Sequence, residues 1–363
     1  MTRLPKDALF QVHLIRVLAM LGIFLHHAWN GPHPDHLDGI AERLFGALFR
    51  WGGLGVVFFN ILSGFLLALP HLGASRRPLP SCGPFMRYRM LRILPPYYLA
   101  LLLFCAGNIV LFRTEWSAAV FTFLKHAVFL QSFQYSTLLS NMAAYWYMGL
   151  LVQFYLLFPW LLKLFVRLGA AQTCLLICAL SWGGCEILAR YLESHPDSAL
   201  GMAGYLVYFN LPGRLPEFAV GMWMAGAWQP AGRSLPGIPF DPGFTAFVGG
   251  SLLFVLLGMP FAWEMRLPLL GVYKAACSFV VLMALFLLPM TAQWGSSPVV
   301  TRLAATSYSI YLVHQPLLSY SALWAIEGLG PFLSLALLTL TVGPVCYVLA
   351  RWIDKAADKV VQF

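Results

Sequence analysis

The chain contains a succession of apolar runs of 18 residues or more, and this feature limits the folds that are open to it. A run of that length with few charges is long enough to cross a bilayer as a helix. Of the 363 residues, 60% are hydrophobic and 10% are charged, whereas soluble domains carry about 25% charged residues. We therefore predict an all-α fold, a polytopic bundle of transmembrane helices that forms one domain over residues 1–363, with no appended soluble domain.

The apolar runs predict about ten spans, roughly over 12–29, 46–69, 93–112, 146–164, 171–190, 204–228, 243–260, 268–290, 302–322 and 330–351. The linker Pro70–Met90 holds four arginines. Cytoplasmic loops of membrane proteins carry an excess of Lys and Arg, so this linker is predicted to be cytoplasmic. An even number of spans then places both termini in the cytoplasm.

The distribution of basic residues supports this orientation. Fourteen lie on the predicted inner side: Arg3, Lys6, Arg76, Arg77, Arg87, Arg89, Arg92, Lys163, Arg167, Arg233, Arg302, Arg351, Lys355 and Lys359. Six lie on the predicted outer side: Arg43, Arg113, Lys125, Arg190, Arg266 and Lys274. The net charge of +9 therefore reflects topology, and we predict no nucleic-acid partner.

One apolar run, Gln11–Asn30, contains ionisable side chains at membrane depth. Arg16 and His27 lie eleven residues apart, about three turns at 3.6 residues per turn, so they share one face of a helix. His26 is rotated roughly 80–100° away from that face. An ionisable residue inside a span costs roughly 2.5–3.5 kcal/mol to insert and is functional by default. The alternative is that Arg16 snorkels to one interface and His27 lies among the far headgroups.

Two polar clusters occupy the next spans. Gly52–Leu67 combines glycines with Asn60 and Ser63, which predicts either close helix packing or the floor of a ligand pocket. In Phe85–Tyr98, Arg89 and Arg92 share a face. These arginines either anchor the cytoplasmic end of a span or bind the phosphates of a cytoplasmic ligand. The two prolines that follow, Pro95 and Pro96, predict a break or a kink.

The later spans hold two more clusters. Arg214 and Glu217 lie three residues apart between prolines, which predicts a broken helix with either a polar site or a structural ion pair. Tyr311 and His314 share a face, with Ser307 one turn earlier, and the alternative to a site there is an interfacial histidine. The seven cysteines form no CxxC pair. They and the scattered histidines predict no disulfide framework and no metal site.

In their order along the chain, these motifs resemble the bacterial acyltransferase-3 family of integral-membrane O-acyltransferases. The family begins with an Arg, ten residues and a His in the first span, which Arg16 and His27 match. Its later motifs are matched by Phe58, Phe59, Ser63, Gly64 and Phe65, by Arg89, Arg92, Ile93, Pro95 and Tyr97, and by Gln153–Pro159, Arg214–Phe218 and Ser307–Pro316. Leu151 and Val152 stand where members often carry acidic residues.

The resemblance implies an enzyme that moves an acyl group, with acetyl expected, from cytoplasmic acyl-CoA to a hydroxyl of a glycan, a lipid-linked sugar or a small acceptor. Acyl-CoA would be a co-substrate, with no permanently bound cofactor. The resemblance places the chain as a multi-pass protein of the bacterial inner membrane, in contact with its lipids. It assigns catalysis to His27 and Arg16 and donor binding to Arg89, Arg92 and Tyr97. The expected acceptor and supporting residues are His26, Asn60, Ser63, Arg214, Glu217, Ser307, Tyr311 and His314.

Two other classes of function fit the same polar residues. Broken helices and ionisable residues inside spans also occur in transporters, so a glycan or small-molecule exporter is the main alternative. A purely structural partner of an assembly is the third class, and it leaves Arg16 and His27 unexplained.

Overall fold

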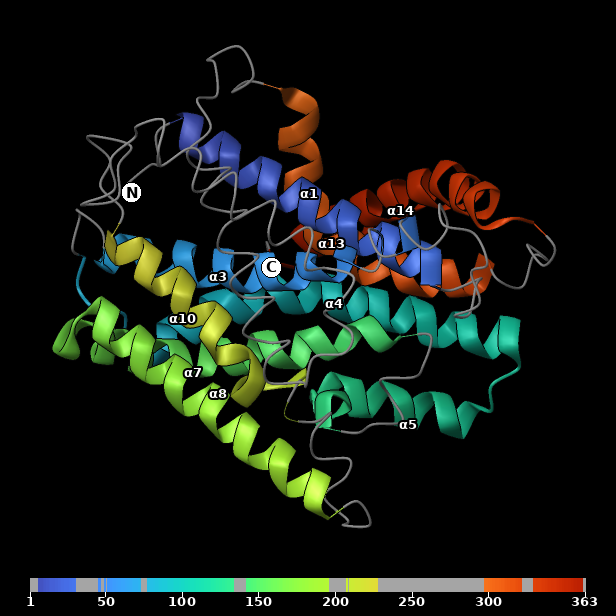
Figure 1. Cartoon of the computed structure of the whole chain (residues 1–363). Coiled ribbons are helices and arrows are strands. Elements are labelled where there is room, and N and C mark those ends of the chain that lie inside the picture. Colours follow the sequence, from blue (N-terminus) through green and yellow to red (C-terminus); the bar gives the residue numbers. More distant parts are fainter. Residues whose placement is uncertain are drawn as a thin grey trace. The chain divides into compact units, whose positions relative to one another are not determined.

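The computed structural model describes residues 6–30, 45–46, 49, 51–72, 77–133, 142–195, 207, 209–227, 297–321 and 329–361. Over these residues the regular elements are helices, and no strand occurs among them. The long helices, labelled in Figure 1, are α1 (Lys6–Asn30), α3 (Leu54–Leu72), α4 (Cys82–Phe112), α7 (Trp146–Leu168), α8 (Ala170–Ser194), α10 (Leu211–Ala227), α13 (Pro298–Ser321) and α14 (Pro331–Val361). The shorter ones are η1 (Trp51–Gly53), α5 (Trp116–Ala127), η2 (Leu130–Phe133) and η3 (Ala143–Tyr145). The predicted all-α class is confirmed for this part of the chain.

The chain divides into two compact units, each described by itself below. The first unit consists of Met1–Ala19, Gly53–Ser81 and Leu156–Ala304. The second consists of Met20–Gly52, Cys82–Tyr155 and Ala305–Phe363. Helices α1, α7 and α13 therefore contribute residues to both units.

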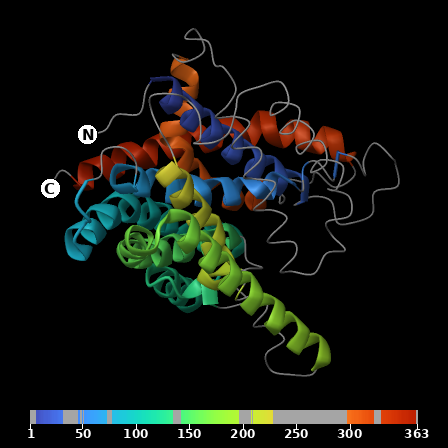
Figure 2. The same cartoon turned by 60° about the vertical axis from the view of Figure 1, so that its left-hand side comes forward.

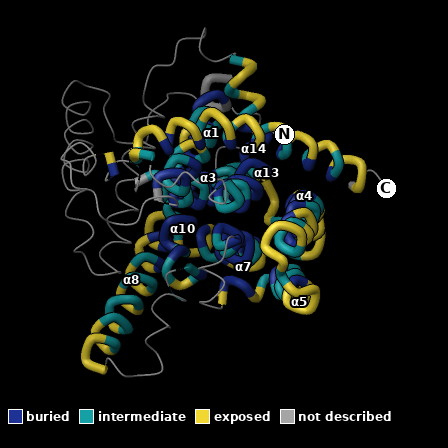
Figure 3. The backbone as a smooth tube through the Cα atoms, turned by 90° about the vertical axis from the view of Figure 1, so that its right-hand side faces the viewer, coloured by how far each residue is buried: buried dark blue, intermediate teal, exposed yellow. Residues whose placement is uncertain are grey.

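Helices α3 and α10 form the core of the first unit and lie against each other in both Figure 1 and Figure 2. Their backbones approach closely at two glycines. A Cβ atom on Gly64 would collide with the carbonyl oxygen of Phe218, and one on Gly221 would collide with that of Ile61. Small residues allow such contacts between membrane helices. Phe65 and Phe218 are buried in this unit, and Figure 3 shows α10 as mainly buried.

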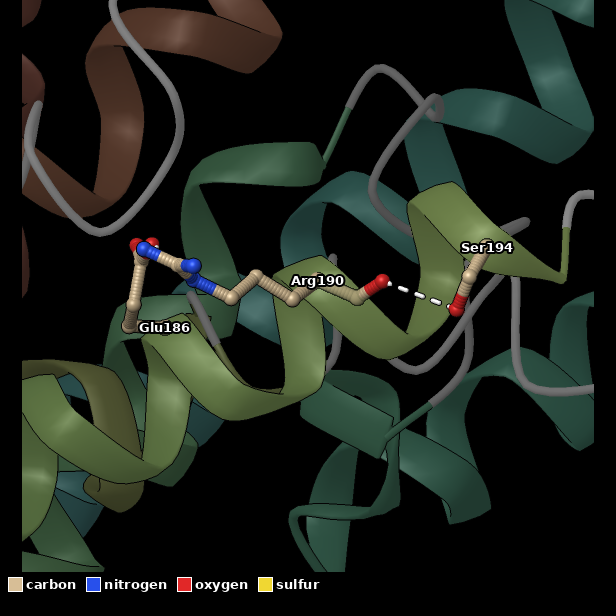
Figure 4. A network of polar contacts seen from close by, with 3 residues as sticks. All are labelled: Glu186, Arg190 and Ser194. Atoms are coloured by element: carbon tan, nitrogen blue, oxygen red, sulfur yellow. Dashed lines mark hydrogen bonds and ion pairs between the residues drawn. The ribbon is translucent and has the colours of Figure 1, made fainter.

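Helix α8 packs against α10 and follows α7 after a turn of one residue. That residue, Gly169, has a φ of 91°, which glycine adopts without a steric penalty. The far end of α8 is largely exposed (Figure 3). There Arg190 pairs with Glu186 at 2.8 Å, and the Ser194 hydroxyl donates to the Arg190 carbonyl oxygen at 3.1 Å (Figure 4). An exposed pair of this kind contributes only about 0.3–0.5 kcal/mol, so it supports the helix locally.

Helix α4 is central to the second unit, with α5 and α14 packed against it. Tyr97 and Tyr98 on α4 donate their hydroxyl hydrogens to the carbonyl oxygens of His126, at 2.9 Å, and Ala127, at 3.0 Å. These carbonyls belong to the last turn of α5, where carbonyl oxygens lack partners within the helix. That of His126 also accepts the backbone N–H of Phe129 at 3.1 Å. The two tyrosines add hydrogen bonds to this end of α5 and connect it to α4.

Helix α13 is joined to α4 by two more tyrosines. The hydroxyl of Tyr308 donates to the Ile93 carbonyl oxygen at 2.9 Å, and that of Tyr320 donates to the Phe104 carbonyl oxygen at 3.1 Å. Gly107 makes room for Tyr320, because a Cβ atom at this position would lie 2.7 Å from the tyrosine hydroxyl. Polar contacts thus connect α4 and α13 at two levels.

Six of the described helices are long and apolar enough to cross a membrane. They are Phe10–Trp29, Leu54–Leu72, Cys82–Phe112, Ala143–Leu168, Ala170–Ser194 and Pro331–Val360. Each overlaps a predicted span. The predicted spans 204–228 and 302–322 overlap α10 and α13, while 243–260 and 268–290 lie outside the described residues. The total of about ten spans and the side of the termini stay predictions.

The structure corrects two details. Helix α4 begins at Cys82, well before the predicted span, because hydropathy detects only its apolar part; Arg89 therefore lies on a helix and not in a linker. The prolines do not break the helices: α4 continues through Pro95 and Pro96, and α10 continues through Pro216. A proline has no N–H, so it leaves a carbonyl oxygen of the preceding turn without a hydrogen bond. In membrane helices, neighbouring helices, side chains and small changes of the local helix geometry satisfy this carbonyl.

Candidate active site

Helix α1 is continuous over Lys6–Asn30 and carries both Arg16 and His27. Eleven residues correspond to about three helical turns, so the two positions fall on the same face of α1. Both side chains are half-buried. The helix that the Arg-to-His spacing requires is therefore present.

Two glycines bring the chain close to α1 beside the histidines. A Cβ atom on Gly52 of η1 would collide with the carbonyl oxygen of Gly22 in α1 and would lie 3.0 Å from the Cβ atom of His26. Nearby, Nδ1 of His26 lies 3.3 Å from the carbonyl oxygen of Phe49. The glycine-rich segment therefore permits close packing here, and His26 is engaged by the backbone.

The imidazole of His27 has two other imidazoles as neighbours. Its ring centroid lies 5.1 Å from that of His314 on α13, with the ring planes inclined by 46°. It also lies 5.1 Å from that of His26, in an edge-to-face arrangement at 73°. The structure thus brings three of the predicted site residues together in the second unit.

His314 is held by contacts on α13 and beyond. Its Nδ1 lies 2.6 Å from the carbonyl oxygen of Tyr311, and the Tyr311 hydroxyl donates to the Ala144 carbonyl oxygen at 2.7 Å. Nε2 of His314 is buried and has no hydrogen-bond partner among the residues that the structure describes. Ser307 is buried one turn before Tyr311. Tyr311 therefore contacts His314, while Ser307 lies about two turns away from His314 on the same helix.

The guanidinium group of Arg89 lies among three aromatic rings. The distances from its Cζ atom to the ring centroids are 5.4 Å for Phe85, 5.5 Å for Tyr88 and 5.8 Å for Tyr155. Its Nε is buried and has no hydrogen-bond partner within the described part of the chain. Arg92, one turn later, is exposed. The contact between Arg89 and the ring of Tyr155 could not be predicted from the sequence, because Tyr155 belongs to α7 and the spacing of residues within α4 does not indicate it.

Tyr97 lies in a different, buried polar cluster. Besides its bond to the His126 carbonyl oxygen, its hydroxyl lies 3.4 Å from Nε2 of Gln131, which donates to the Tyr145 carbonyl oxygen at 2.9 Å. Nδ1 of His126 donates to the Thr122 carbonyl oxygen at 2.8 Å, and burial lowers the pKa of His126 to about 4. The donor-binding role of Tyr97 stays a prediction. The sequence offered no signal for this cluster beyond scattered polar residues.

The first unit contains the predicted pair of Arg214 and Glu217. Nη1 of Arg214 donates to Oε1 of Glu217 at 2.7 Å, and Nδ2 of Asn60 donates to Oε2 at 2.6 Å. All three side chains are buried. Both carboxylate oxygens therefore have a donor, which a buried charge requires. Ser63, one turn after Asn60 on α3, is half-buried.

The predicted site residues fall into two groups, one in each unit. The first unit holds Arg16, Asn60, Ser63, Arg214 and Glu217, and the second holds His26, His27, Arg89, Arg92, Tyr97, Ser307, Tyr311 and His314. Ring contacts and hydrogen bonds join His26, His27, Tyr311 and His314 into one cluster. Among the described residues, no group of three or more His, Cys, Asp or Glu side chains is arranged to hold a metal ion.

The long apolar helices and the ionisable residues within them define the class: a multi-pass helical membrane protein. Residues 9–351 match the family model Acyl_transf_3, described as an acyltransferase domain. The chain therefore belongs to the acyltransferase-3 family.

The chain is also similar to a Caenorhabditis elegans protein, Regulator of hypoxia-inducible factor 1, with 25% identity over 240 residues. The matched region covers 60% of this chain and 46% of that protein, so the chain spans less than half of that relative's length. No solved structure matches the chain.

Proposed function

We propose that this protein is a membrane O-acyltransferase that moves an acetyl group from cytoplasmic acetyl-CoA to a hydroxyl of a cell-envelope or secreted glycan, a lipid-linked sugar or a small hydroxylated acceptor. Its proposed location is the bacterial inner membrane. Membership of the acyltransferase-3 family supports acyl transfer in general. The observation that carries the proposal is the imidazole cluster, in which the ring of His27 lies 5.1 Å from that of His314.

His27 is the proposed catalytic group, because a neutral imidazole can take a proton near neutral pH. As general base it removes the hydrogen of the acceptor hydroxyl while the oxygen attacks the thioester carbonyl carbon. The carbon–sulfur bond then breaks, and the CoA thiolate leaves and receives the proton from His27. In the covalent alternative, a nitrogen of His27 attacks the carbonyl first, and the acyl-imidazole then reacts with the hydroxyl.

Arg16 is the proposed electrostatic partner in this reaction. Negative charge develops on the carbonyl oxygen in the transition state, and fixed cations stabilise such charge most effectively where water is scarce. Arg16 shares the His27 face of α1 but lies about three turns, roughly 16 Å, along the helix axis from it, so its charge would act on a substrate that extends along this face. A second possibility is that Arg16 holds the donor.

Arg89 and Arg92 are the proposed binding site for the phosphates of acetyl-CoA, with Tyr97 as a further donor-binding residue. The planar guanidinium group of arginine presents pairs of N–H donors whose geometry matches the oxygens of a phosphate. The exposed Arg92 and the buried Nε donor of Arg89 without a hydrogen-bond partner in the described residues support anion binding. A buried donor left without an acceptor is unfavourable, so a ligand that supplies an acceptor is stabilised there.

The remaining predicted residues are proposed to support the acceptor side. Ser307, Tyr311 and His26 belong to the second unit, as do His27 and His314, while Asn60, Ser63, Arg214 and Glu217 belong to the first. The Asn60–Glu217–Arg214 contacts join α3 to α10. These contacts support a role in positioning the two helices. The alternative is contact with the acceptor, which the buried Oδ1 of Asn60, without a hydrogen-bond partner among the described residues, favours.

The test uses inverted membrane vesicles from expressing cells, which contain the native acceptors, and acetyl-CoA labelled on the acetyl group. We expect release of free CoA together with transfer of the label to a glycan or lipid fraction. Vesicles with Arg16→Lys should lose this transfer, because the ammonium group of lysine keeps the charge but lacks the planar array of N–H donors of a guanidinium group. Vesicles of the wild type that release no CoA and label no product would contradict the proposal.

A glycan or small-molecule exporter is the second candidate function. The buried Arg214–Glu217 pair within an apolar helix favours it, because such charges also mark translocation paths. The same vesicles separate the two functions. An exporter moves unmodified solute across the membrane and leaves labelled acetyl-CoA intact.

A further inference from the structure

The side chain of His314 is held in one tautomer by its own helix. A carbonyl oxygen only accepts hydrogen bonds, so the 2.6 Å contact of Nδ1 with the Tyr311 carbonyl assigns the hydrogen to Nδ1. In a neutral imidazole the other nitrogen is then an acceptor. This acceptor, Nε2, is buried and has no hydrogen-bond partner among the described residues.

The ring with this unused acceptor is the neighbour of His27. The centroids of the two rings lie 5.1 Å apart, a separation at which nitrogens on facing ring edges come within hydrogen-bond reach. Catalytic hydrogen bonds are often long or poorly aligned before substrate binds. A buried acceptor without a donor is unfavourable, so an N–H of His27 turned toward Nε2 stabilises both rings.

His26 is not an equivalent partner for His27. Its Nδ1 lies 3.3 Å from the Phe49 carbonyl oxygen. Its ring meets that of His27 edge to face, at 73°. Imidazole lone pairs lie in the ring plane, so this edge-to-face arrangement is poorly suited to a bond between two ring nitrogens. The carbonyl contact leaves Nε2 of His26 as an acceptor as well, so ring orientation separates the two neighbours. The plane of the His314 ring is inclined to that of His27 by 46°, which makes His314 the better placed acceptor.

We propose that His314 is the positioning residue of His27. Its Nε2 accepts the N–H of His27, which leaves the lone pair on the opposite nitrogen of His27 for the acceptor hydroxyl. This inference rests on the proposed function. A second imidazole here takes the place of the carboxylate that orients the histidine of a Ser-His-Asp triad.

The proton balance of the reaction is unchanged by this arrangement. The acceptor O–H breaks and its proton goes to His27, whose N–H bond to His314 then becomes charge-assisted and stronger. As the carbon–sulfur bond of the donor breaks, the same proton passes to the CoA sulfur. Both imidazoles are neutral again at the end of the cycle, and His314 contributes by orienting His27.

The test compares His314→Leu with His314→Gln in inverted vesicles of the full chain, with labelled acetyl-CoA and with rates divided by the amount of monodisperse protein. Leucine offers no acceptor, so kcat should fall roughly 100-fold, the lower end of general acid–base contributions, while the KM for acetyl-CoA changes less than about twofold. The amide oxygen of glutamine can accept the N–H, so His314→Gln should recover part of the rate. Thr301→Ala, an exposed polar change on the same helix, should keep the wild-type kcat per folded molecule.

Pairing with His27→Ala provides a second criterion. If His314 acts through His27, the double variant His27→Ala/His314→Leu should be no slower than His27→Ala alone, because effects of residues that act as a unit are non-additive. Wild-type kcat in His314→Leu, equal losses in the leucine and glutamine variants, or additive losses would overturn the positioning role and leave the acyltransferase function standing. A wild-type protein that transfers no label would contradict both the positioning role of His314 and the acyltransferase function.

Discussion

At the residue scale, Arg89 and Arg92 lie one turn apart but have different surroundings. Three aromatic rings surround the Arg89 guanidinium, whereas Arg92 is exposed. We predict that Arg89→Lys raises the KM for acetyl-CoA roughly tenfold or more, because an ammonium lacks the planar fork and a lost charge-assisted bond costs about 1.5–3 kcal/mol. Initial rates against acetyl-CoA concentration in inverted vesicles measure it.

Arg87 supplies the matched control for this prediction. It lies on the same helix and is exposed, so Arg87→Lys should leave the KM for acetyl-CoA unchanged. Replacement of both Arg89 and Arg92 by Gln should raise the KM further than Arg89→Lys. An unchanged KM in the folded double variant would show that these arginines serve topology alone.

The buried His126 makes the stability of the folded chain depend on pH. Burial lowers its pKa from 6.5 to about 4, so the native chain keeps it neutral while the unfolded chain binds a proton below pH 6.5. Stability should therefore fall as the pH drops from about 6.5 to 4, with a loss of about 2 kcal/mol at pH 5. The thermal midpoint in detergent at pH 7.5 and pH 5 measures this loss.

The control for this prediction removes the titrating group. His126→Gln should narrow the difference between the two midpoints, whereas a glutamine at the exposed His195 should leave it as in the wild type. A difference that is equally wide in His126→Gln would place the acid sensitivity in other groups.

Single residues could be selected from the sequence more easily than their partners. Arg16, His27 and His314 stand out because ionisable side chains in apolar runs are rare. The approach of His27 to His314 and the bond of Asn60 to Glu217 could not be predicted. Helical spacing indicates which residues share one face of a helix, and it carries no information on the helix that lies opposite.

At the element scale, the contact of α3 with α10 depends on two glycines. A methyl group on Gly64 or Gly221 would collide with a backbone oxygen of the facing helix, and backbone cannot move aside as a flexible side chain can. We predict that Gly64→Ala and Gly221→Ala each separate α3 from α10 and lower the thermal midpoint in detergent. The yield of monodisperse protein should fall with it.

Gly183 on α8 is the matched control. A Cβ atom there meets nothing within 4 Å, and alanine is preferred over glycine inside a helix by roughly 0.5–1 kcal/mol. Gly183→Ala should therefore be neutral or slightly stabilising. If Gly64→Ala and Gly221→Ala behave like Gly183→Ala, the helices do not meet as closely as the structure indicates.

Helices could be predicted from the sequence where a physical threshold, such as the length of an apolar run, decides whether they form. Runs of 18 or more apolar residues predict spans, and six described helices meet that criterion. The start of α4 was missed because its first turns are polar, and hydropathy is silent about polar helix ends. The prolines predicted a break or a kink in α4 and a break in α10. Both helices continue through their prolines, because neighbouring helices can support a backbone that propensity alone would interrupt.

At the scale of the whole molecule, the charge distribution predicts the topology. Both termini should face the cytoplasm and the segment Arg113–Tyr145 should face outward, because fourteen basic residues fall on the predicted inner side and six on the outer. Reporter fusions at the C-terminus and within this outer segment measure it. A C-terminus on the outer side would contradict the arrangement of ten spans.

The central claim is that His27 performs the chemistry, and acyl transfer by His27→Ala and His26→Ala, per monodisperse molecule, tests it most directly. The two residues are adjacent, but His27 lies on the Arg16 face and contacts His314, whereas His26 contacts the Phe49 carbonyl oxygen. We predict that His27→Ala loses at least about 100-fold in the rate of label transfer from acetyl-CoA, and that His26→Ala loses far less. Near-normal transfer by His27→Ala, or a greater loss in His26→Ala, would contradict the account.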